Sequence, residues 1–324
     1  MRAIIPVAGV GSRLRPHTYT VPKVLLNVGG KPIVGHILDR LIENGFDEAT
    51  IVIGYLGEKI KEYVVRNYTM KVDFVEQEER LGLGHAIYLS RHTVSRDPIL
   101  IILGDTIFDV DLKALMSSDS SVLGVKEVED PRRFGVAEIE NGLITKLVEK
   151  PDQPKSKLAL VGIYYIKQPH ILIDCLRDEI KGNIRTRGEF QLTDALQMMI
   201  DRGERMKTFA IEGWFDCGKP ETLLETNRHL LDRQPTAVAR PDVVIQPPVF
   251  VSDKATVRNS VLGPYATIAD DAVVENAIIR NSIVSEGSRV MNTLLEDSIV
   301  GNNAVVRGTY KRVNIGDSSE LEFD

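Results

Sequence analysis

Short apolar runs alternate with amphipathic segments through the first part of the chain. Such runs are typical of strands buried on both faces of a parallel sheet, and the segments between them carry apolar residues at helical spacing. The pattern therefore predicts parallel strands joined by right-handed crossover helices in one twisted sheet. Strands are expected at residues 3–7, 49–53, 72–75 and 99–103.

Two crossover helices are expected between these strands. The first follows Pro32, with Ile33, Ile37, Leu38, Leu41 and Ile42 at helical spacing, and the second contains Ala86, Ile87 and Leu89. Alternating strands then extend from 121 to 166. Further helices are expected near 169–176, 190–200 and 220–231. These elements predict one α/β domain with a mixed sheet over residues 1–232.

Prolines crowd the segment that follows, where Pro235, Pro241, Pro247 and Pro248 interrupt helix and central strand alike. We therefore assign residues 233–248 to a linker. Beyond it, a heptad of the form aliphatic, small, polar, polar, small, any, aliphatic recurs. It starts at residues 251, 262, 268, 284, 300 and 315.

The later heptads are spaced about one coil apart, as in a hexapeptide-repeat β-helix whose coils bury one another's apolar edges. A small β-sandwich with regular turns is the alternative, but a step of six through Val249, Ala255, Val261 and Thr267 favours the β-helix. Residues 249–324 are therefore predicted to form a second domain.

Composition narrows the function classes. The 324 residues are 43% hydrophobic and carry a net charge of −6, which gives no basic field for nucleic acid or an anionic membrane. No run approaches the roughly 20 apolar residues of a membrane span, and the N-terminus lacks a signal-peptide pattern, so a cytoplasmic protein is expected. Cys175 and Cys217 are too few for a disulfide framework.

A glycine-rich turn follows the first predicted strand, at the sheet edge where open α/β sheets bind ligands. Gly9 and Gly11 let backbone N–H groups approach phosphate oxygens, and Arg13 and Lys23 add positive charge. Leu14 stands where the dinucleotide fingerprint needs a third glycine, and the P-loop motif is absent. Alone, the turn is weak evidence for phosphate binding.

The longer stretch GVGSRLRPHTYTVPKVLLNVGGKP resembles the signature of the sugar nucleotidyltransferases, or nucleoside-diphosphate-sugar pyrophosphorylases. The resemblance covers about residues 1–232. It implies a Rossmann-like mixed-sheet nucleotidyltransferase domain, here followed by a left-handed parallel β-helix. In the family the signature arginine and lysine flank the phosphoryl group under attack, which corresponds to Arg13 and Lys23. The implied nucleotide-binding residues are Ala8, Gly9, Gly11, Ser12, Gln77 and Gly82.

Asp105 and Asp216 each end an apolar segment and match the two magnesium-binding aspartates of the family. A carboxylate in such a place is unfavourable unless it holds a cation, and oxygen ligands suit Mg²⁺. The alternative is that each aspartate caps the turn or helix after it. None of the six histidines is spaced for metal binding with another.

On the sugar side, the resemblance implies contacts to the hexose or its phosphate from Gly135, Glu149, Lys150, Tyr164 and Glu189. Lys150 would hold the sugar phosphate and act in catalysis with the signature cations. The Glu149 carboxylate could accept hydrogen bonds from two sugar hydroxyls. The alternatives are an exposed charge pair after a strand for Glu149 and Lys150, and a helix cap for the segment that begins at Glu189.

The implied reaction joins a nucleoside triphosphate to a sugar 1-phosphate, with Mg²⁺ as cofactor. The region around Gln77 is similar to that of enzymes that use dTTP or UTP. The chain is expected to form a homo-oligomer. Long-form glucose-1-phosphate thymidylyltransferases are the most similar group, although Thr106 departs from the asparagine expected there. Two rivals stay open. A hexapeptide-repeat acyltransferase is disfavoured because no histidine follows His229, and a non-catalytic regulatory or scaffold subunit because the cations and aspartates are all present.

Overall fold

The computed structural model describes residues 1–234 and 240–308. Its contacts divide the chain into two compact units. The first holds residues 1–26 and 31–226, and the second holds residues 27–30 and the chain from Asn227 onward. Pro235 and the repeat at 315–321 lie outside the described residues. The domain boundaries at 232 and 248 stay predictions.

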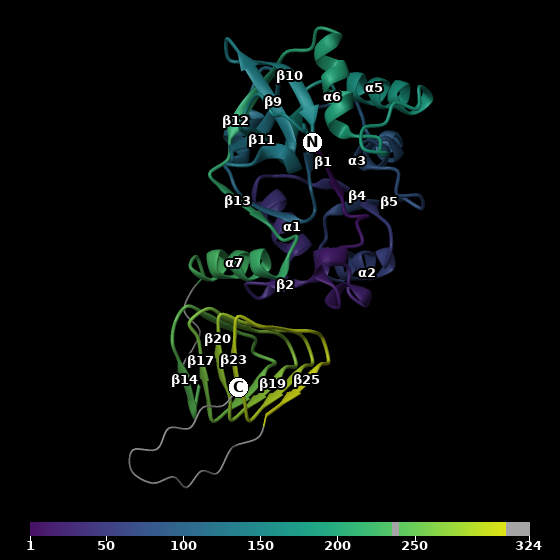
Figure 1. Ribbon diagram of the computed structural model, residues 1–324. Helices are drawn as coiled ribbons and strands as arrows, with labels where there is room; N and C mark the ends of the chain where they lie inside the picture. The colour runs from purple at the N-terminus through teal and green to yellow at the C-terminus, as the bar shows by residue number, and fades with distance from the viewer. Residues whose placement is uncertain (235–239, 309–324) are drawn as a thin grey trace. The chain divides into compact units, whose positions relative to one another are not determined.

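A nine-stranded sheet forms the centre of the first unit (Figure 1). Strand β1 (Arg2–Pro6) pairs in parallel with β4 (Glu48–Ile53) on one side and with β6 (Ile99–Ile102) on the other, and β5 (Lys71–Glu76) pairs in parallel with β4. The four strands expected from the apolar runs are confirmed. Their residues are almost entirely buried in β1, β4 and β6, as the continuous apolar pattern requires.

The other half of the sheet is mixed. Strand β11 (Leu158–Ile166) runs antiparallel to β6, β8 (Ser121–Glu127) and β9 (Gly135–Glu140). β10 (Leu143–Glu149) pairs with β9, and β12 (Met206–Ala210) lies parallel to β8. The mixed sheet predicted for this part of the chain is confirmed.

Helices form around the sheet where apolar residues recur at helical spacing. Helix α1 (Ile33–Glu43) buries Ile33, Ile37, Leu38 and Leu41 of the expected set, whereas Ile42 is exposed. Helices α3 (Leu83–Leu89), α5 (Pro169–Lys181) and α6 (Leu192–Asp201) contact one another and share a core with Ile4 and Val52 of the sheet. This unit also contains α2 (Gly57–Asn67), α4 (Leu112–Met116), β3 (Lys31–Pro32), β7 (Thr106–Asp109) and β13 (Gly213–Asp216).

The strand order changes direction beside β1. The chain adds β4 and then β5 on one side of β1 and returns to place β6 on the other. At such a switch point the loops after two neighbouring strands diverge and leave a crevice at their carboxyl ends. The loops that begin at Val7 and Leu103 therefore flank the place where an open α/β sheet binds its ligand.

Within residues 240–308, the second unit forms three parallel sheets of four short strands each, stacked as the β-helix that the repeats predict and consistent with the left-handed form that the resemblance implies (Figure 1). Val251, Ile268, Val284 and Val300, which begin four of the recurring heptads, stack in register. The sheets consist of β14 (Val243–Ile245), β17 (Ser260–Leu262), β20 (Ile278–Arg280) and β23 (Leu294–Glu296); β15 (Val249–Val251), β18 (Ala266–Ile268), β21 (Ile283–Val284) and β24 (Ile299–Val300); and β16 (Thr256–Arg258), β19 (Val273–Glu275), β22 (Arg289–Met291) and β25 (Val305–Arg307).

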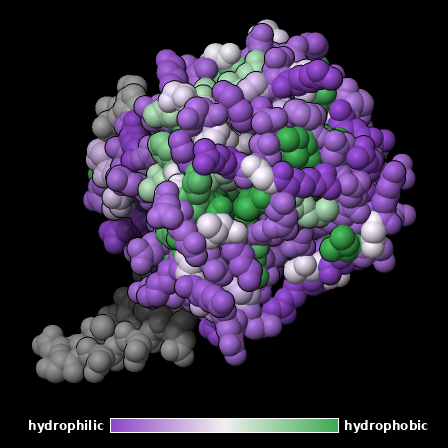
Figure 2. Space-filling model, turned by 90° about the horizontal axis from the view of Figure 1, so that it is seen from above, coloured by the Kyte–Doolittle hydropathy of each residue, from purple (hydrophilic) through white to green (hydrophobic). Residues whose placement is uncertain are grey.

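The face in Figure 2 is mostly hydrophilic, with apolar side chains in small separate groups. Within residues 1–234 and 240–308, none of the helices combines the length and apolarity needed to cross a membrane.

Cys175 and Cys217 are both buried, and neither forms a disulfide.

A short turn from the signature stretch belongs to the second unit. Strand β2 (Asn27–Val28) precedes Gly29. The Gly29 N–H donates to Oδ1 of Asn227, a residue of helix α7 (Pro220–Leu231), at 2.8 Å. The same oxygen accepts from Thr267 Oγ1 at 2.6 Å, and Asn227 is fully buried. One buried side-chain amide in α7 thus binds both the turn at Gly29 and strand β18 (Ala266–Ile268), which carries Thr267.

Asn227→Ala should lower the stability of the second unit, because it leaves the Gly29 N–H and the Thr267 hydroxyl without their acceptor. We expect a loss of about 1–3 kcal/mol in the free energy of unfolding, measured by urea denaturation. Asn67→Ala, which removes an exposed amide bonded to the Tyr63 carbonyl, is the control and should change it by less than about 0.5 kcal/mol. Equal stability in the two variants would contradict the role of Asn227.

Candidate active site

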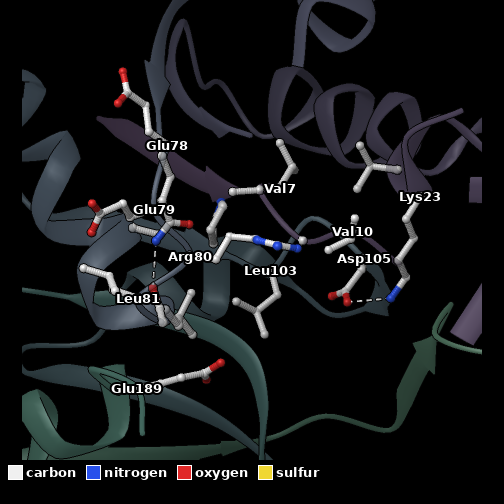
Figure 3. A pocket seen from close by; sticks show the side chains of 18 residues that line it. Val7, Val10, Lys23, Glu78, Glu79, Arg80, Leu81, Leu103, Asp105 and Glu189 are labelled. Atoms are coloured by element: carbon white, nitrogen blue, oxygen red, sulfur yellow. Dashed lines mark hydrogen bonds and ion pairs between the residues drawn. The ribbon is translucent and has the colours of Figure 1, made fainter. Parts of the chain in front are cut away.

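A cavity of about 900 Å³ opens at the switch point of the sheet. Its walls come from the loops after β1, β5 and β6, as the strand order requires. Figure 3 shows Lys23 and Asp105 at one end, and Leu81 and Glu189 toward the other. Its lining includes Ala8, Gly9, Gln77, Gly82, Lys23, Asp105 and Glu189 from the predicted site. Loops from distant parts of the chain therefore meet at one sheet edge.

The glycine-rich turn wraps the cation end of this cavity. Gly11 adopts a left-handed φ of 65° before the short helix Ser12–Leu14, and a Cβ there would lie 3.0 Å from both Lys23 Cβ and Thr18 Cγ2. The Thr18 hydroxyl donates to the Gly11 carbonyl at 2.8 Å. Glycine is thus required here by backbone conformation and by close packing against the lysine. Ser12 is exposed in the turn and lies outside the cavity lining.

Lys23 brings the two predicted aspartates together. Its Nζ lies 2.6 Å from Asp105 Oδ2 and 4.0 Å from Asp216 Oδ1, although the three residues come from three separate segments. The lysine side chain is 9% exposed. Strand β13, which ends at Asp216, pairs antiparallel with β7, and this pairing sets Asp216 against Thr106, next to Asp105.

Arg13 completes the group. A Cβ on Gly218 would lie 2.8 Å from Asp216 Oδ1 and 3.0 Å from Arg13 Nη2, so the guanidinium and the carboxylate lie around the same glycine. Arg13, Lys23, Asp105 and Asp216 are therefore gathered around one place. Cations and carboxylates alternate there, which favours binding of phosphate oxygens and a metal ion.

The surroundings shift the pKa values of the two carboxyls in opposite directions. Burial acts to raise the pKa of Asp105, but the adjacent Lys23 ammonium outweighs it and holds that pKa below its ordinary value. Burial raises the pKa of Asp216; Lys23 and Arg13 oppose this rise, and the charge of Asp105 adds to it. Another cation beside Asp216 would relieve that repulsion.

The donor set fits Mg²⁺ bound together with a phosphate. No group of three or more His, Cys, Asp or Glu side chains suited to a metal occurs in the parts of the chain that the structure describes. Asp105 and Asp216 instead offer two carboxylates within 4.0 Å of one ammonium nitrogen. Mg²⁺ is often held by one or two carboxylates, with substrate phosphates and waters as its other ligands.

The opposite end of the cavity is organised by Gln77. Its Nε2 donates to the Gly82 carbonyl at 3.0 Å and lies 3.2 Å from His85 Nδ1. Phe190 N–H donates to the Leu81 carbonyl at 2.8 Å, and Gly84 N–H donates to the Phe190 carbonyl at 2.9 Å. The loop after β5 is thus bound by backbone hydrogen bonds to the segment that carries Glu189.

Four of the predicted sugar-side residues form a second cluster, which consists of Gly135, Glu149, Lys150 and Tyr164. Glu149 Oε2 accepts from Thr193 Oγ1 at 2.7 Å, and its Oε1 lies 3.1 Å from Lys150 Nζ. Gly135 pairs across the strands with Glu149, and a Cβ there would lie 2.8 Å from Thr193 Oγ1. Burial and the nearby charge of Glu149 raise the pKa of Tyr164.

This cluster does not line the 900 Å³ cavity. It connects to the cavity through the segment from Glu189 to Asp194. In the Glu149–Lys150 ion pair, the Glu149 side chain is only 8% exposed and the Lys150 side chain is 39% exposed. Gln191 is the residue before α6, and its side chain makes no capping hydrogen bond to the helix.

Three contacts of the site were not expected from the sequence. The charge of Arg133 lowers the pKa of Asp216, against the rise caused by burial. Trp214 packs edge-on against Phe134, with ring centroids 5.1 Å apart, on the strand that carries Asp216. Thr193 bonds Glu149 directly. Arg133, Trp214 and Thr193 lie within a few residues of Gly135, Asp216 and Glu189 in the sequence, but sequence spacing did not reveal these contacts.

The chain belongs to the nucleotidyl transferase family, whose model matches residues 2–233. It is therefore a nucleotidyltransferase, and enzymes of this family typically use a divalent metal. The matched part contains all the predicted site residues.

Comparisons with individual proteins agree with this. The chain is 30% identical to the low-salt glycan biosynthesis nucleotidyltransferase Agl11 of Haloferax volcanii, over all of both chains. It is 30% identical to a glucose-1-phosphate thymidylyltransferase of Streptomyces griseus, over 100% of this chain and 99% of that protein. It is 37% identical to the bifunctional protein GlmU of Methanocaldococcus jannaschii, over 94% of this chain and 78% of the relative. A crystal structure of UDP-glucose pyrophosphorylase complexed with UDP-glucose is similar, with a TM-score of 0.62 and 25% identity over 72% of this chain and 99% of that one.

Gly82→Ala should abolish the close approach of the two loops at the far end of the cavity. Gly82 has a φ of 114°, and a Cβ there would lie 2.4 Å from the Phe190 carbonyl oxygen. We expect the KM for the nucleoside triphosphate to rise at least about tenfold, measured by initial rates. Gly203→Ala is the matched control, because it has a similar φ of 93° but no atom within 4 Å of the added carbon. The same KM change in both variants would show that the clash at Gly82 is unimportant.

Proposed function

We propose that the enzyme transfers a nucleotidyl group from dTTP or UTP to glucose 1-phosphate, or to a closely related sugar 1-phosphate, and releases pyrophosphate. The observation that carries this proposal is the convergence of Lys23, Asp105 and Asp216 at the switch point of the sheet. The proposed setting is the cytoplasm, without nucleic acid or membrane as a partner.

In the proposed reaction, an oxygen of the sugar phosphate attacks the α-phosphorus of the triphosphate. The new bond joins this oxygen to the α-phosphorus, and the bond to the bridging oxygen of pyrophosphate breaks in line with it. No protein nucleophile is needed, because phosphoryl transfer depends on positioning and charge neutralisation. The products are a nucleoside-diphosphate sugar and pyrophosphate.

Each predicted residue has a role in this scheme. Arg13 and Lys23 stabilise charge on the transferring and leaving phosphates, and the backbone of Ala8, Gly9, Gly11 and Ser12 borders the triphosphate. Mg²⁺ held by Asp105 and Asp216 would supply further neutralisation of phosphate charge. Lys150 orients the attacking phosphate.

Specificity is proposed to arise at the two ends of the site. Gln77 and Gly82 would read the edge of a pyrimidine base, and the pair of glutamates Glu149 and Glu189, with Gly135 and Tyr164, would contact the hexose. Carboxylates that bind sugar hydroxyls reject analogues that lack them more strongly than apolar contacts do. The names of the Streptomyces griseus relative and of the solved pyrophosphorylase support thymidine or uridine nucleotides and glucose.

The β-helix is proposed to assemble the enzyme as a homo-oligomer. Its flat parallel sheets offer faces that can pair between subunits. Catalysis by the β-helix itself is not favoured, since the family match accounts for residues 2–233 and no histidine follows His229.

A panel of the four triphosphates with glucose 1-phosphate and mannose 1-phosphate tests the proposal directly. We expect pyrophosphate release to be fastest with dTTP or UTP and glucose 1-phosphate, to stop with EDTA, and to return with Mg²⁺, because the two carboxylates alone cannot neutralise the triphosphate. Coupled detection of pyrophosphate measures the rate, and mass spectrometry identifies the nucleotide-sugar. Binding of nucleotide without any product across the panel would instead favour a regulatory subunit.

Lys23→Ala should reduce kcat at least about 100-fold, because the ammonium stabilises charge that develops in the transition state. Asp105→Asn should do the same by removing a metal ligand while keeping the side-chain shape. The matched control is Lys207→Ala, which breaks a surface pair with Asp119 at 2.9 Å and should leave kcat unchanged. Near-normal kcat in Lys23→Ala and Asp105→Asn, with circular dichroism confirming folded protein, would refute these roles.

A further inference from the structure

Helix α5 carries one acidic side chain that its surroundings do not explain. Within this fully described helix, the buried residues are Pro169, Leu172, Cys175, Leu176 and Glu179. Glu179 is 0% exposed and is the charged member of that set. A buried acid without a cationic partner is strongly unfavourable, so its presence in a core helix requires a reason.

The carboxyl of Glu179 has one firm contact and one oxygen without a partner. Its Oε1 accepts from the Gln191 backbone N–H at 2.8 Å. Its Oε2 is buried and has no hydrogen-bond partner among the described residues, and a Cβ on Gly84 would lie 3.2 Å from it. Burial raises the pKa of Glu179 to about 7, although the hydrogen bond from Gln191 opposes the rise.

The segment that Glu179 holds is the junction between the two ends of the active site. Gln191 follows Phe190, whose N–H donates to the Leu81 carbonyl in the loop beside Gln77 and whose carbonyl accepts from the Gly84 N–H in the first turn of α3. The Gln191 side chain donates to Glu189 Oε2 at 3.1 Å, and Glu189 lines the cavity. Helix α6 begins immediately afterwards, at Leu192.

The same junction reaches the sugar-side cluster within two residues. Thr193, in the first turn of α6, donates to Glu149. The Oδ2 atom of the next residue, Asp194, is also buried without a hydrogen-bond partner in the described chain, and the charge of Asp194 raises the pKa of Glu179. A displacement of Gln191 would therefore move Glu189 and Thr193 together and release the loop at Leu81.

We propose that Glu179 is a positioning residue for the reaction. Its carboxyl fixes the segment from Glu189 to Gln191, so that the nucleotide side and the sugar side of the site are held in one arrangement. Glu179 touches neither substrate and acts through backbone hydrogen bonds. This inference rests on the proposed function for its kinetic consequence, but its structural consequence can be measured independently.

The test compares Glu179→Ala, Glu179→Gln and Leu172→Ala. Leu172 is a fully buried apolar residue of the same helix, so its truncation is a control for loss of stability alone. Hydrogen exchange is followed by mass spectrometry for peptides that cover residues 81–84 and 189–191, and KM and kcat are measured for both substrates. All measurements are made below the onset of thermal unfolding.

We expect Glu179→Ala to increase exchange in both peptides and to raise both KM values about tenfold, the effect of losing a buried hydrogen bond to an acidic group. Glu179→Gln keeps an acceptor for the Gln191 N–H and should stay within about threefold of the natural enzyme. Leu172→Ala should lower Tm without raising either KM or the exchange of these peptides.

Unchanged exchange in Glu179→Ala, or a change equal to that in Leu172→Ala, would overturn the positioning role. Glu179→Gln as impaired as Glu179→Ala would overturn it too, because the acceptor would then not be the feature that matters. Absence of activity in the natural enzyme with every substrate pair would refute the proposed function, while the exchange measurement would still decide the role of Glu179.

Discussion

The ion pair between Lys23 and Asp105 is the interaction on which the site depends. Two carboxylates that approach each other at a partly buried sheet edge repel, and the lysine between them offsets that repulsion. In the proposed reaction the same three side chains would meet the requirements of a triphosphate, with the ammonium toward phosphate oxygens and the carboxylates toward a metal. On that proposal, the groups that balance one another's charge in the protein without substrate would also balance charge during transfer.

The topology of the sheet gives this ion pair its location. The chain leaves β1 and β6 in opposite directions, so the glycine-rich turn and Asp105 diverge around one crevice. The antiparallel pairing of β7 with β13 brings Asp216 to the same edge from much later in the sequence. Backbone hydrogen bonds at Leu81, Gly84 and Phe190 then connect this edge to the sugar-side cluster.

Much of this arrangement could be predicted from the sequence, because its signals are local. The apolar runs predicted the buried parallel strands, and the heptads at 251, 268, 284 and 300 predicted residues that stack in register. The grouping of Arg13 and Lys23 with Asp105 and Asp216 was implied by the family resemblance, through the signature stretch for the two cations and through the two segment-ending aspartates. The roles of Arg133 and Glu179 did not, because both act through charges or contacts between segments far apart in the chain. An acid on an amphipathic helix gives no sign in the sequence that it is buried.

The turn at Gly29 and Gly30 has a consequence for how such chains can be recombined. The polypeptide enters the second unit only a few residues after Lys23 and returns at Lys31, so the two units are interlaced rather than joined end to end. The ring of Phe250 lies where a side chain on Gly30 would have to be. An exchange of the repeats for those of another protein would therefore have to preserve an aromatic platform over this turn, and a chimera made by simple fusion at the proline-rich segment would lose it.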